Sequence, residues 1–326
     1  MRGPGKQQQP RIRSRRSLHD FAGLGRGSIL LLLASALCAV VACRPSLWAR
    51  PASRLVRMTG AGSGQPPAPV QLSDEAKQKV KDQLKPLVKP ATRLALSPVG
   101  DERPPITRTC FGGAPYLEKG EKWPSCAKCS QPLSFICQLN MKDRQDPGLP
   151  TQGLYTVFYC MNCFPWGSEP ECQGQWLVKY YPKPKKKSAI KAQDASKPET
   201  RTKPCIVKSE AIVSCPPWES LERLAPQVDK FLRKEAPQDP YTPYDEVCLE
   251  LTKREEDHMG TQIGGYPRWI QNEERPVCLT CKKELVLLAQ LDSEEAAGLM
   301  WGDAGCLYFF VCPEHPANVH MTMQCY

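Results

Sequence analysis

The sequence predicts a mainly β (α+β) protein, an internally duplicated domain of two β-rich halves that each carry a zinc-ribbon-like site. A few helices are expected in the N-terminal region and in the insertion between the halves. Two observations predict this fold. Two β-rich regions match each other at a constant offset of 152 residues. Each region also contains two pairs of metal-type ligands, separated by thirty residues.

The positive charge is concentrated at the N-terminus. The formal net charge is +10, and the residues before Met58 contain eleven lysines and arginines but one acid. The remaining 33 basic and 33 acidic residues cancel. A protein that binds nucleic acid draws much of its affinity from a basic folded domain. The body of this chain therefore carries no strong nucleic-acid signal.

Residues 1–57 form a basic and hydrophobic N-terminal extension, read either as a targeting segment or as an untranslated upstream extension. An uncharged run of seventeen residues, 27–43, follows Arg26. This length is at the short limit for a membrane helix, and the Arg/Ser richness fits a mitochondrial transit peptide. Met58 begins a stretch typical of a soluble N-terminus. We expect a cytoplasmic protein that also enters the nucleus; the alternatives are mitochondrial targeting or a membrane anchor through residues 1–57.

Residues 58–104 are expected to be a linker with one short helix. Ser73 can cap a helix over residues 74–85, in which apolar side chains recur every four positions. The first β half covers residues 105–182 and holds short aromatic and β-branched runs, which we expect to be strands at 133–139, 154–159 and 175–181.

Residues 183–243 are expected to be a Lys/Pro linker followed by a helix. The basic run 183–187 resembles a nuclear localisation patch, and a solvated charge run is the alternative. A helix is predicted over 218–235, kinked or started by Pro226. The second β half covers 244–326. It begins with a helical stretch at 244–257 and continues with strands at 284–291, 306–311 and 319–326.

The repeat is visible without gaps. Ten of thirty positions are identical between residues 111–140 and 263–292. The identities include a Gly-Gly pair, a Gln-Leu pair and the cysteines. Duplication accounts for this match better than chance. We expect the two halves to pack face to face around a pseudo-twofold axis, with the intervening linker and helices as an insertion.

The ligand spacing predicts two zinc sites. In each half, two C-x2-C or C-x2-H knuckles supply the four corners of a tetrahedron. The second site has a histidine where the first has a cysteine, an exchange that suits zinc but not a disulfide. Four protein ligands leave no open position, so both ions should be structural. The predicted ligands are Cys126, Cys129, Cys160 and Cys163 in the first half and Cys278, Cys281, Cys312 and His315 in the second.

Other readings of the cysteines and glycines stay open. The C-x2-C pairs are alternatively redox pairs or ordinary buried cysteines. The other ten cysteines, such as Cys137, Cys172 and Cys248, have no matching spacing and are assigned no role. The Gly-Gly pairs lack the residues of a phosphate loop and are read as turns. Asp303 is read as a turn residue rather than a catalytic acid.

The motifs resemble two known groups of proteins. Residues 262–271, Cys278 with Cys281, and the run 300–315 resemble the YwqG-like family of uncharacterised domains. The first half looks like the start of programmed cell death protein 2 and its yeast relatives, through residues 111–115, 126–129, 131–138 and 160. This second resemblance implies a dedicated chaperone for a small-subunit ribosomal protein. The chain lacks the MYND-type zinc module that some of these relatives carry between the halves.

We therefore expect a monomeric, zinc-binding protein-interaction scaffold. The resemblance implies a chaperone or adaptor in ribosome assembly, with a basic ribosomal protein as client. One alternative is an enzyme that uses a cleft between the halves. The sequence favours a non-enzyme, since no nucleophile–base pair is evident and only His258 and His320 are uncommitted histidines in the body. The other alternative is a nucleic-acid-binding zinc-ribbon protein, which would use the ribbons and residues 183–187.

Overall fold

The computed structural model describes residues 71–99, 105–186, 194–254 and 260–326. The chain divides into residues 1–64 and 65–326, and all described residues belong to the second unit. The expectations for residues 1–57, Lys187, residues 255–257 and His258 lie outside the described residues. Within the described ranges, no helix is long and apolar enough to cross a membrane.

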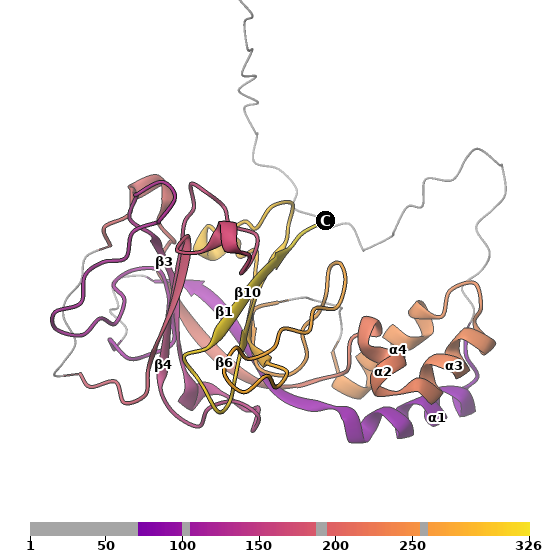
Figure 1. Cartoon of the computed structure of the whole chain (residues 1–326). Helices are drawn as coiled ribbons and strands as arrows, with labels where there is room; N and C mark the ends of the chain where they lie inside the picture. Colours follow the sequence, from indigo (N-terminus) through magenta and orange to yellow (C-terminus); the bar gives the residue numbers. More distant parts are fainter. Residues whose placement is uncertain (1–70, 100–104, 187–193, 255–259) are drawn as a thin grey trace, which may run out of the picture. The chain divides into compact units, whose positions relative to one another are not determined.

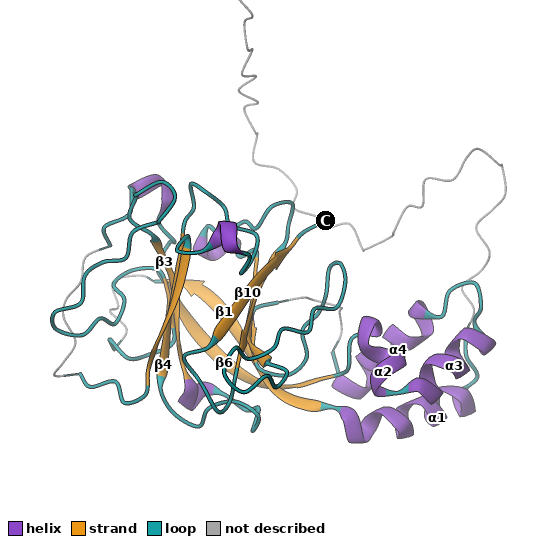
Figure 2. Ribbon diagram, in the orientation of Figure 1, coloured by secondary structure: helices purple, strands orange, loops and turns teal. Residues whose placement is uncertain are grey.

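A ten-stranded antiparallel sheet dominates the structure, which confirms a mainly β fold with few helices (Figures 1 and 2). Its strand order is β10-β9-β8-β7-β1-β6-β2-β3-β4-β5. Strands β4 and β9 coincide with the predicted runs 154–159 and 306–311. The strands are β1 (Lys89–Pro98), β2 (Cys110–Phe111), β3 (Ser134–Asn140), β4 (Leu154–Tyr159), β5 (Trp176–Tyr181), β6 (Cys205–Ser214), β7 (Gln262–Ile263), β8 (Val286–Asp292), β9 (Cys306–Val311) and β10 (Val319–Gln324).

The two central strands, β1 and β6, lie in segments that the sequence led us to expect as linker. They pair over ten positions, from Lys89↔Ser214 to Pro98↔Cys205. β1 was not predicted because it contains Pro90 and Pro98, and proline usually argues against a central strand. Both prolines stand near the ends of β1, where the loss of a backbone N–H is tolerated. Charged side chains on the exposed face of the pair interrupt the apolar runs that signal a strand.

The central strands also cross between the two β-rich regions. β1 precedes the first region in the chain but pairs with β7 of the second, with Thr92 opposite Ile263. β6 precedes the second region but pairs with β2 of the first, with Phe111 opposite Cys205. The segments before the two regions are therefore exchanged, and they join both regions into one continuous sheet.

Irregular features of the two regions recur 152 residues apart. β3 has a bulge between Phe135 and Cys137, and β8 has one between Leu287 and Ala289. Two buried glutamines also make equivalent hydrogen bonds. Gln138 accepts from the Tyr116 N–H and donates to the Arg108 carbonyl. Gln290 accepts from the Arg268 N–H and donates to the Gly260 carbonyl.

One hydrophobic core joins the two regions. Its buried members come from β3 and β4 as well as β8, β9 and β10. The ring of Tyr159 meets that of Trp301 edge-on, with centroids 5.2 Å apart. The connection between β4 and β5 also covers the edge of β10, because the Met323 N–H donates to the Trp166 carbonyl at 2.7 Å. The two ends of the sheet are thus held together by packing and by hydrogen bonds.

The helices form a second, smaller hydrophobic cluster of their own. They are α1 (Asp74–Leu84), α2 (Leu221–Leu224), α3 (Pro226–Glu235) and α4 (Tyr241–Thr252), shown in Figure 2. Ser73 caps α1 as predicted, with its side chain accepting from the Ala76 N–H. The single helix expected over 218–235 is divided at Ala225, because Pro226 starts a new helix. α4 begins at Tyr241, three residues before the predicted start.

Candidate metal centres

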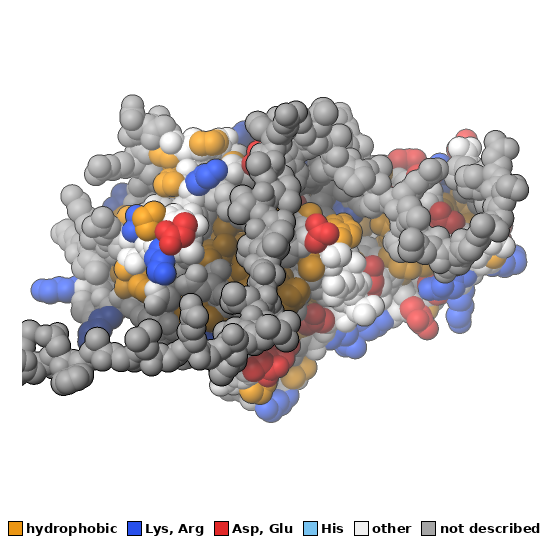
Figure 3. Space-filling model, turned by 90° about the horizontal axis from the view of Figure 1, so that it is seen from above, with side chains coloured by type: hydrophobic (Ala, Val, Ile, Leu, Met, Phe, Trp, Pro, Cys, Tyr) orange, Lys and Arg blue, Asp and Glu red, His pale blue; other side chains and the backbone are white. Residues whose placement is uncertain are grey.

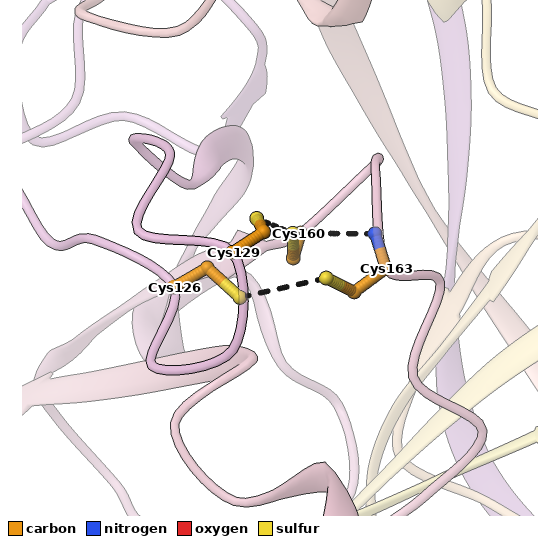
Figure 4. Close-up of side chains that lie close together, drawn as sticks. All are labelled: Cys126, Cys129, Cys160 and Cys163. Atoms are coloured by element: carbon orange, nitrogen blue, oxygen red, sulfur yellow. Dashed lines mark hydrogen bonds between the residues drawn. The ribbon is translucent and has the colours of Figure 1, made fainter.

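The first cluster joins two knuckles at one end of a strand pair. Cys126 and Cys129 precede β3, and Cys160 and Cys163 follow β4. Because β3 and β4 are antiparallel, with Ser134 opposite Tyr159, the start of one strand lies beside the end of the other. Figure 4 shows the four side chains turned toward one another from the two knuckles.

The spacing of the four sulfur atoms suits one bound ion. Cys126 Sγ lies 3.8 Å from Cys163 Sγ, and Cys129 Sγ lies 3.5 Å from Cys160 Sγ. All four donor atoms lie within 4.8 Å of one another. A zinc–sulfur bond of about 2.3 Å gives a tetrahedron with edges of about 3.8 Å. A disulfide would need about 2.05 Å, and every described cysteine is a free thiol.

Local turns form each knuckle of the first cluster. The Cys126 N–H donates to the Gln131 carbonyl at 2.8 Å, and the Ser130 N–H donates to the Cys126 carbonyl at 2.9 Å. Ser130 takes a left-handed backbone conformation, with φ of 58°, to close this turn. On the other knuckle, the Cys163 N–H donates to Cys160 Sγ at 3.4 Å. Burial is the main influence on Cys160 and raises its pKa, whereas this backbone donor opposes it by favouring the thiolate.

The second cluster has the same construction with one different donor. Cys278 and Cys281 precede β8, and Cys312 and His315 follow β9, whose end pairs with the start of β8. Cys281 Sγ lies 3.6 Å from Cys312 Sγ. His315 Nδ1 lies 3.7 Å from Cys278 Sγ and 3.5 Å from Cys312 Sγ. With zinc–sulfur and zinc–nitrogen bonds of about 2.3 and 2.05 Å, a tetrahedral edge between them is about 3.6 Å.

Hydrogen bonds around the clusters lower the pKa of two thiols, Cys129 and Cys278. The backbone N–H of Gln131 is the main cause that lowers the pKa of Cys129 to about 7. Burial opposes ionisation of Cys278, but backbone N–H groups and the Asn318 amide outweigh it and lower its pKa to about 5. The Asn318 Nδ2 atom lies 3.4 Å from Cys278 Sγ. Asn318 is a supporting residue that the ligand spacing alone did not reveal.

Each cluster rests on its own group of aromatic side chains. In the first, Cys126 and Cys160 pack with Phe135, Phe158 and Trp123, whose indole meets the Phe158 ring at 5.4 Å. In the second, Cys278 and Cys312 pack with three aromatic residues, Trp269, Tyr308 and Phe310. The knuckles are therefore attached to well-packed parts of the sheet.

The donor sets determine what a bound ion would do. The first cluster offers four sulfur atoms and the second offers three sulfur atoms and one ring nitrogen. Soft thiolates and imidazole are the ligands that zinc prefers in tetrahedral sites. Because four side chains complete such a shell, no position remains for a substrate. Each centre could thus tie the start of one strand to the end of its neighbour.

The other residues considered from the sequence take structural positions. Both Gly-Gly pairs have positive φ, and a side chain on Gly112 would place its Cβ 2.4 Å from the Thr202 carbonyl oxygen. Asp303 lies in a turn, where its carbonyl accepts from the Tyr326 N–H. His320 lies on β10 against the Phe310 ring, and burial lowers its pKa.

Two surface hollows, of about 560 Å³ and about 510 Å³, lie outside the metal centres. Pro98, Lys203 and Glu295 line the first, and Glu118, Tyr181 and Lys185 are among the residues that line the second. Neither lining contains a cysteine or a histidine. The clustered donors therefore serve neither hollow.

Comparison with known proteins places the chain in a family. A family model described as a domain of unknown function, DUF1963, matches residues 109–325 and so spans both clusters. A 53-residue stretch is 40% identical to the uncharacterized protein YpfL of Salmonella typhimurium. That match covers 16% of this chain and 12% of the relative. The family match extends over most of the described sheet, and the chain belongs to the DUF1963 family.

Proposed function

We propose that this protein is a zinc-stabilised protein-interaction scaffold, with one structural zinc ion in each centre. The observation that carries the proposal is the gathering of eight predicted ligands into two closed groups of four, each within 4.8 Å. When bound, zinc would supply ligation and no further chemistry. The ligand residues would hold the ends of two neighbouring strands together, because each group of four connects two knuckles at the end of a strand pair.

We also propose that the two halves arose by duplication and that each centre is a zinc ribbon. Three kinds of feature that recur 152 residues apart support this. They are the bulges in β3 and β8, the bonds of the two buried glutamines, and the isolated bridges Ser125↔Pro132 and Val277↔Glu284. Bulges and buried polar bonds are conformational details that two unrelated strand pairs have no reason to share.

The surface supports a protein partner rather than nucleic acid. Acidic and basic side chains are interspersed on the face drawn in Figure 3. The knuckle of the second centre also displays apolar side chains, with Leu279 81% exposed and Val277 52% exposed. Adjacent exposed apolar groups on a rigid support suit contact with another protein. We take this knuckle as the client-binding surface.

The resemblance to programmed cell death protein 2 and its yeast relatives suggests the class of client. On that basis we propose a chaperone or adaptor role in ribosome assembly, with a basic ribosomal protein as client. The YwqG-like resemblance adds no client. The proposal places the protein in the cytoplasm, with entry to the nucleus, as a monomer.

Metal analysis tests the first part of the proposal. The full chain, purified without added metal, should contain about two zinc ions. Thiol titration should unmask the seven ligand cysteines of the two clusters only after denaturation with a chelator present. A protein that is folded, metal-free and reactive at these thiols would refute structural zinc and reopen redox chemistry.

Affinity capture tests the second part. The parent chain should recover one basic protein in stoichiometric amount, and Leu279→Asp should lose it while zinc content stays the same. Met300→Asp is the matched control, since Met300 is also exposed, at 41%, but lies outside the knuckle. Loss in both variants, or recovery of no specific protein by the parent, would contradict the proposed surface.

A further inference from the structure

One side of the central strand β6 is open along most of its length. β6 pairs with β1 at ten positions, but on its other side it pairs with β2 only at Cys205 and Ile206. Among the described residues, no hydrogen bond joins another backbone group to this second side between Lys208 and Val213. Residues 208, 209, 211 and 213 are exposed. This stretch of β6 is therefore a free strand edge within an otherwise paired sheet.

One hydrogen bond of β1 shows which residues of β6 turn toward the open edge. The Leu94 N–H donates to the Thr261 carbonyl at 2.9 Å, on the side of β1 away from β6. Leu94 is the partner of Ser209, and paired residues of antiparallel strands either bond to each other or both point outward. The N–H and carbonyl of Ser209 therefore face the open edge. Because the pattern alternates, those of Ala211 and Val213 face it as well.

A second hydrogen bond supports this alternation. The Val99 N–H donates to the Pro204 carbonyl at 3.0 Å. These two residues continue the register of β1 and β6 five positions beyond Leu94 and Ser209. An odd number of steps changes an outward pair into a directly bonded pair, as observed. The open edge thus presents backbone donors and acceptors in the arrangement that accepts an added strand.

The charges beside the open edge specify which strand it would accept. Lys208 and Glu210 lie on one face of β6, with Nζ and Oε1 2.9 Å apart. Their side chains are 79% and 39% exposed, so this ion pair is weak and both groups can bond to new partners. An antiparallel neighbour would place one residue opposite Glu210 and, two residues later, another opposite Lys208. Opposite charges are favoured at both positions, so the matching strand has a basic residue followed two positions later by an acidic one.

We propose that the open edge of β6 is a peptide-binding site, which takes an extended segment of a protein partner as an added antiparallel strand. The segment carries the basic and acidic residues described above, with β-branched residues between and before them. Ala211 and Val213 lie on the other face of β6 and offer small apolar contacts to these branched side chains. The charged pair discourages strands with the wrong charges. The inference depends neither on the metal centres nor on the proposed client-binding knuckle.

Peptide titration tests the proposal on the full chain as purified. The probe is a capped peptide of sequence Val-Thr-Val-Lys-Val-Glu, and the matched control peptide has its lysine and glutamate exchanged. The probe should bind about tenfold more tightly, because the exchange turns two attractive cross-strand pairs into two repulsive ones. Equal affinities, or no binding of either peptide at about 1 mM, would overturn the proposal.

Residue-resolved amide hydrogen exchange locates the bound strand. In the free chain, the even-numbered amides from 208 to 212 bond to β1 and should exchange slowly, whereas the odd-numbered amides from 209 to 213 should exchange fast. The probe peptide should slow the odd-numbered set alone. Slow exchange of that set in the free chain would show that the edge is already covered and would overturn the proposal. Protection that rises with protein concentration would identify a second copy as the occupant instead.

A pair of variants at one position blocks the edge selectively. Ala211→Pro removes an N–H that points to the open edge, and leaves the ladder with β1 intact. It should weaken binding of the probe peptide at least about tenfold. Ala211→Thr keeps the N–H and should bind like the parent. Unchanged binding by Ala211→Pro would contradict the proposed edge; if that variant does not fold, the two peptides and the exchange pattern of the parent still decide.

Discussion

Exchange of a single ligand between the two centres gives the sharpest test of the metal proposal. Cys163 in the first cluster and His315 in the second are 152 residues apart and end equivalent knuckles. Cys163 Sγ lies 3.8 Å from Cys126 Sγ, and His315 Nδ1 lies 3.7 Å from Cys278 Sγ. The two donors therefore occupy nearly the same corner of a tetrahedron. We expect Cys163→His to keep its ion and Cys163→Ala to lose it.

The expected difference in stability is large. A structural zinc site contributes on the order of 10 kcal/mol of apparent folding free energy. A whole domain is stable by only about 5–15 kcal/mol. The free energy lost with one ion is thus comparable with the total stability of a domain. In the structure, the aromatic cluster around Cys126 and Cys160 would lose the ligation that connects its two knuckles. Cys163→Ala should unfold at much lower denaturant concentration than the parent, and Cys163→His should recover most of the loss.

The assay combines elemental analysis with denaturant unfolding of the parent, Cys163→His, Cys163→Ala and the reciprocal variant His315→Cys. Near-parent zinc content in both exchange variants, with about one ion in Cys163→Ala, would support the equivalence of the two corners. If Cys163→His loses its ion as completely as Cys163→Ala while the second centre stays loaded, the reasoning from donor positions is wrong.

Two further predictions concern buried polar groups. Gln138 is fully buried and bonds to two carbonyls and to the Tyr116 N–H, at 2.6 to 2.9 Å. Gln138→Leu leaves these three groups unsatisfied and should cost about 3–6 kcal/mol in urea unfolding; a cost below about 1 kcal/mol would contradict this. Burial raises the pKa of Asp245 above 3.8. The protonated side chain is therefore favoured in the folded state, and the stability that this adds at low pH is lost as the pH rises through the folded-state pKa. Asp245→Asn should therefore gain stability relative to the parent as the pH rises from 3.8 through the folded-state pKa of Asp245, and a difference that does not change with pH would refute this.

Much of the candidate metal site was predictable because its signals are local. A knuckle needs only two ligands at a fixed short spacing, and the strands that carry the knuckles are apolar on both faces. β4, for example, is buried at every position, and so is β9. A continuous apolar run bounded by turn residues is a strong strand signal. The structure brings together the eight residues that these signals selected.

The central strands were not predictable in the same way. β1 and β6 gain their stability from each other and from β7 and β2, which are distant in sequence. Their own residues alternate irregularly between buried and exposed, so periodicity gives no clear signal.

The position of the centres in the sheet explains why metal would matter in this fold. The strand order places four strands, β7, β1, β6 and β2, between the two pairs that carry the knuckles. The middle of the sheet is held by the ten-position ladder of β1 and β6, whereas β2 and β7 are only two residues long. Strands of two residues form only two paired positions with each neighbour, so the ladder between the central and outer strands is short. Closed metal centres on the outer pairs would supply stability where the ladder does not reach, and their knuckles would remain rigid enough to present Leu279 to a partner.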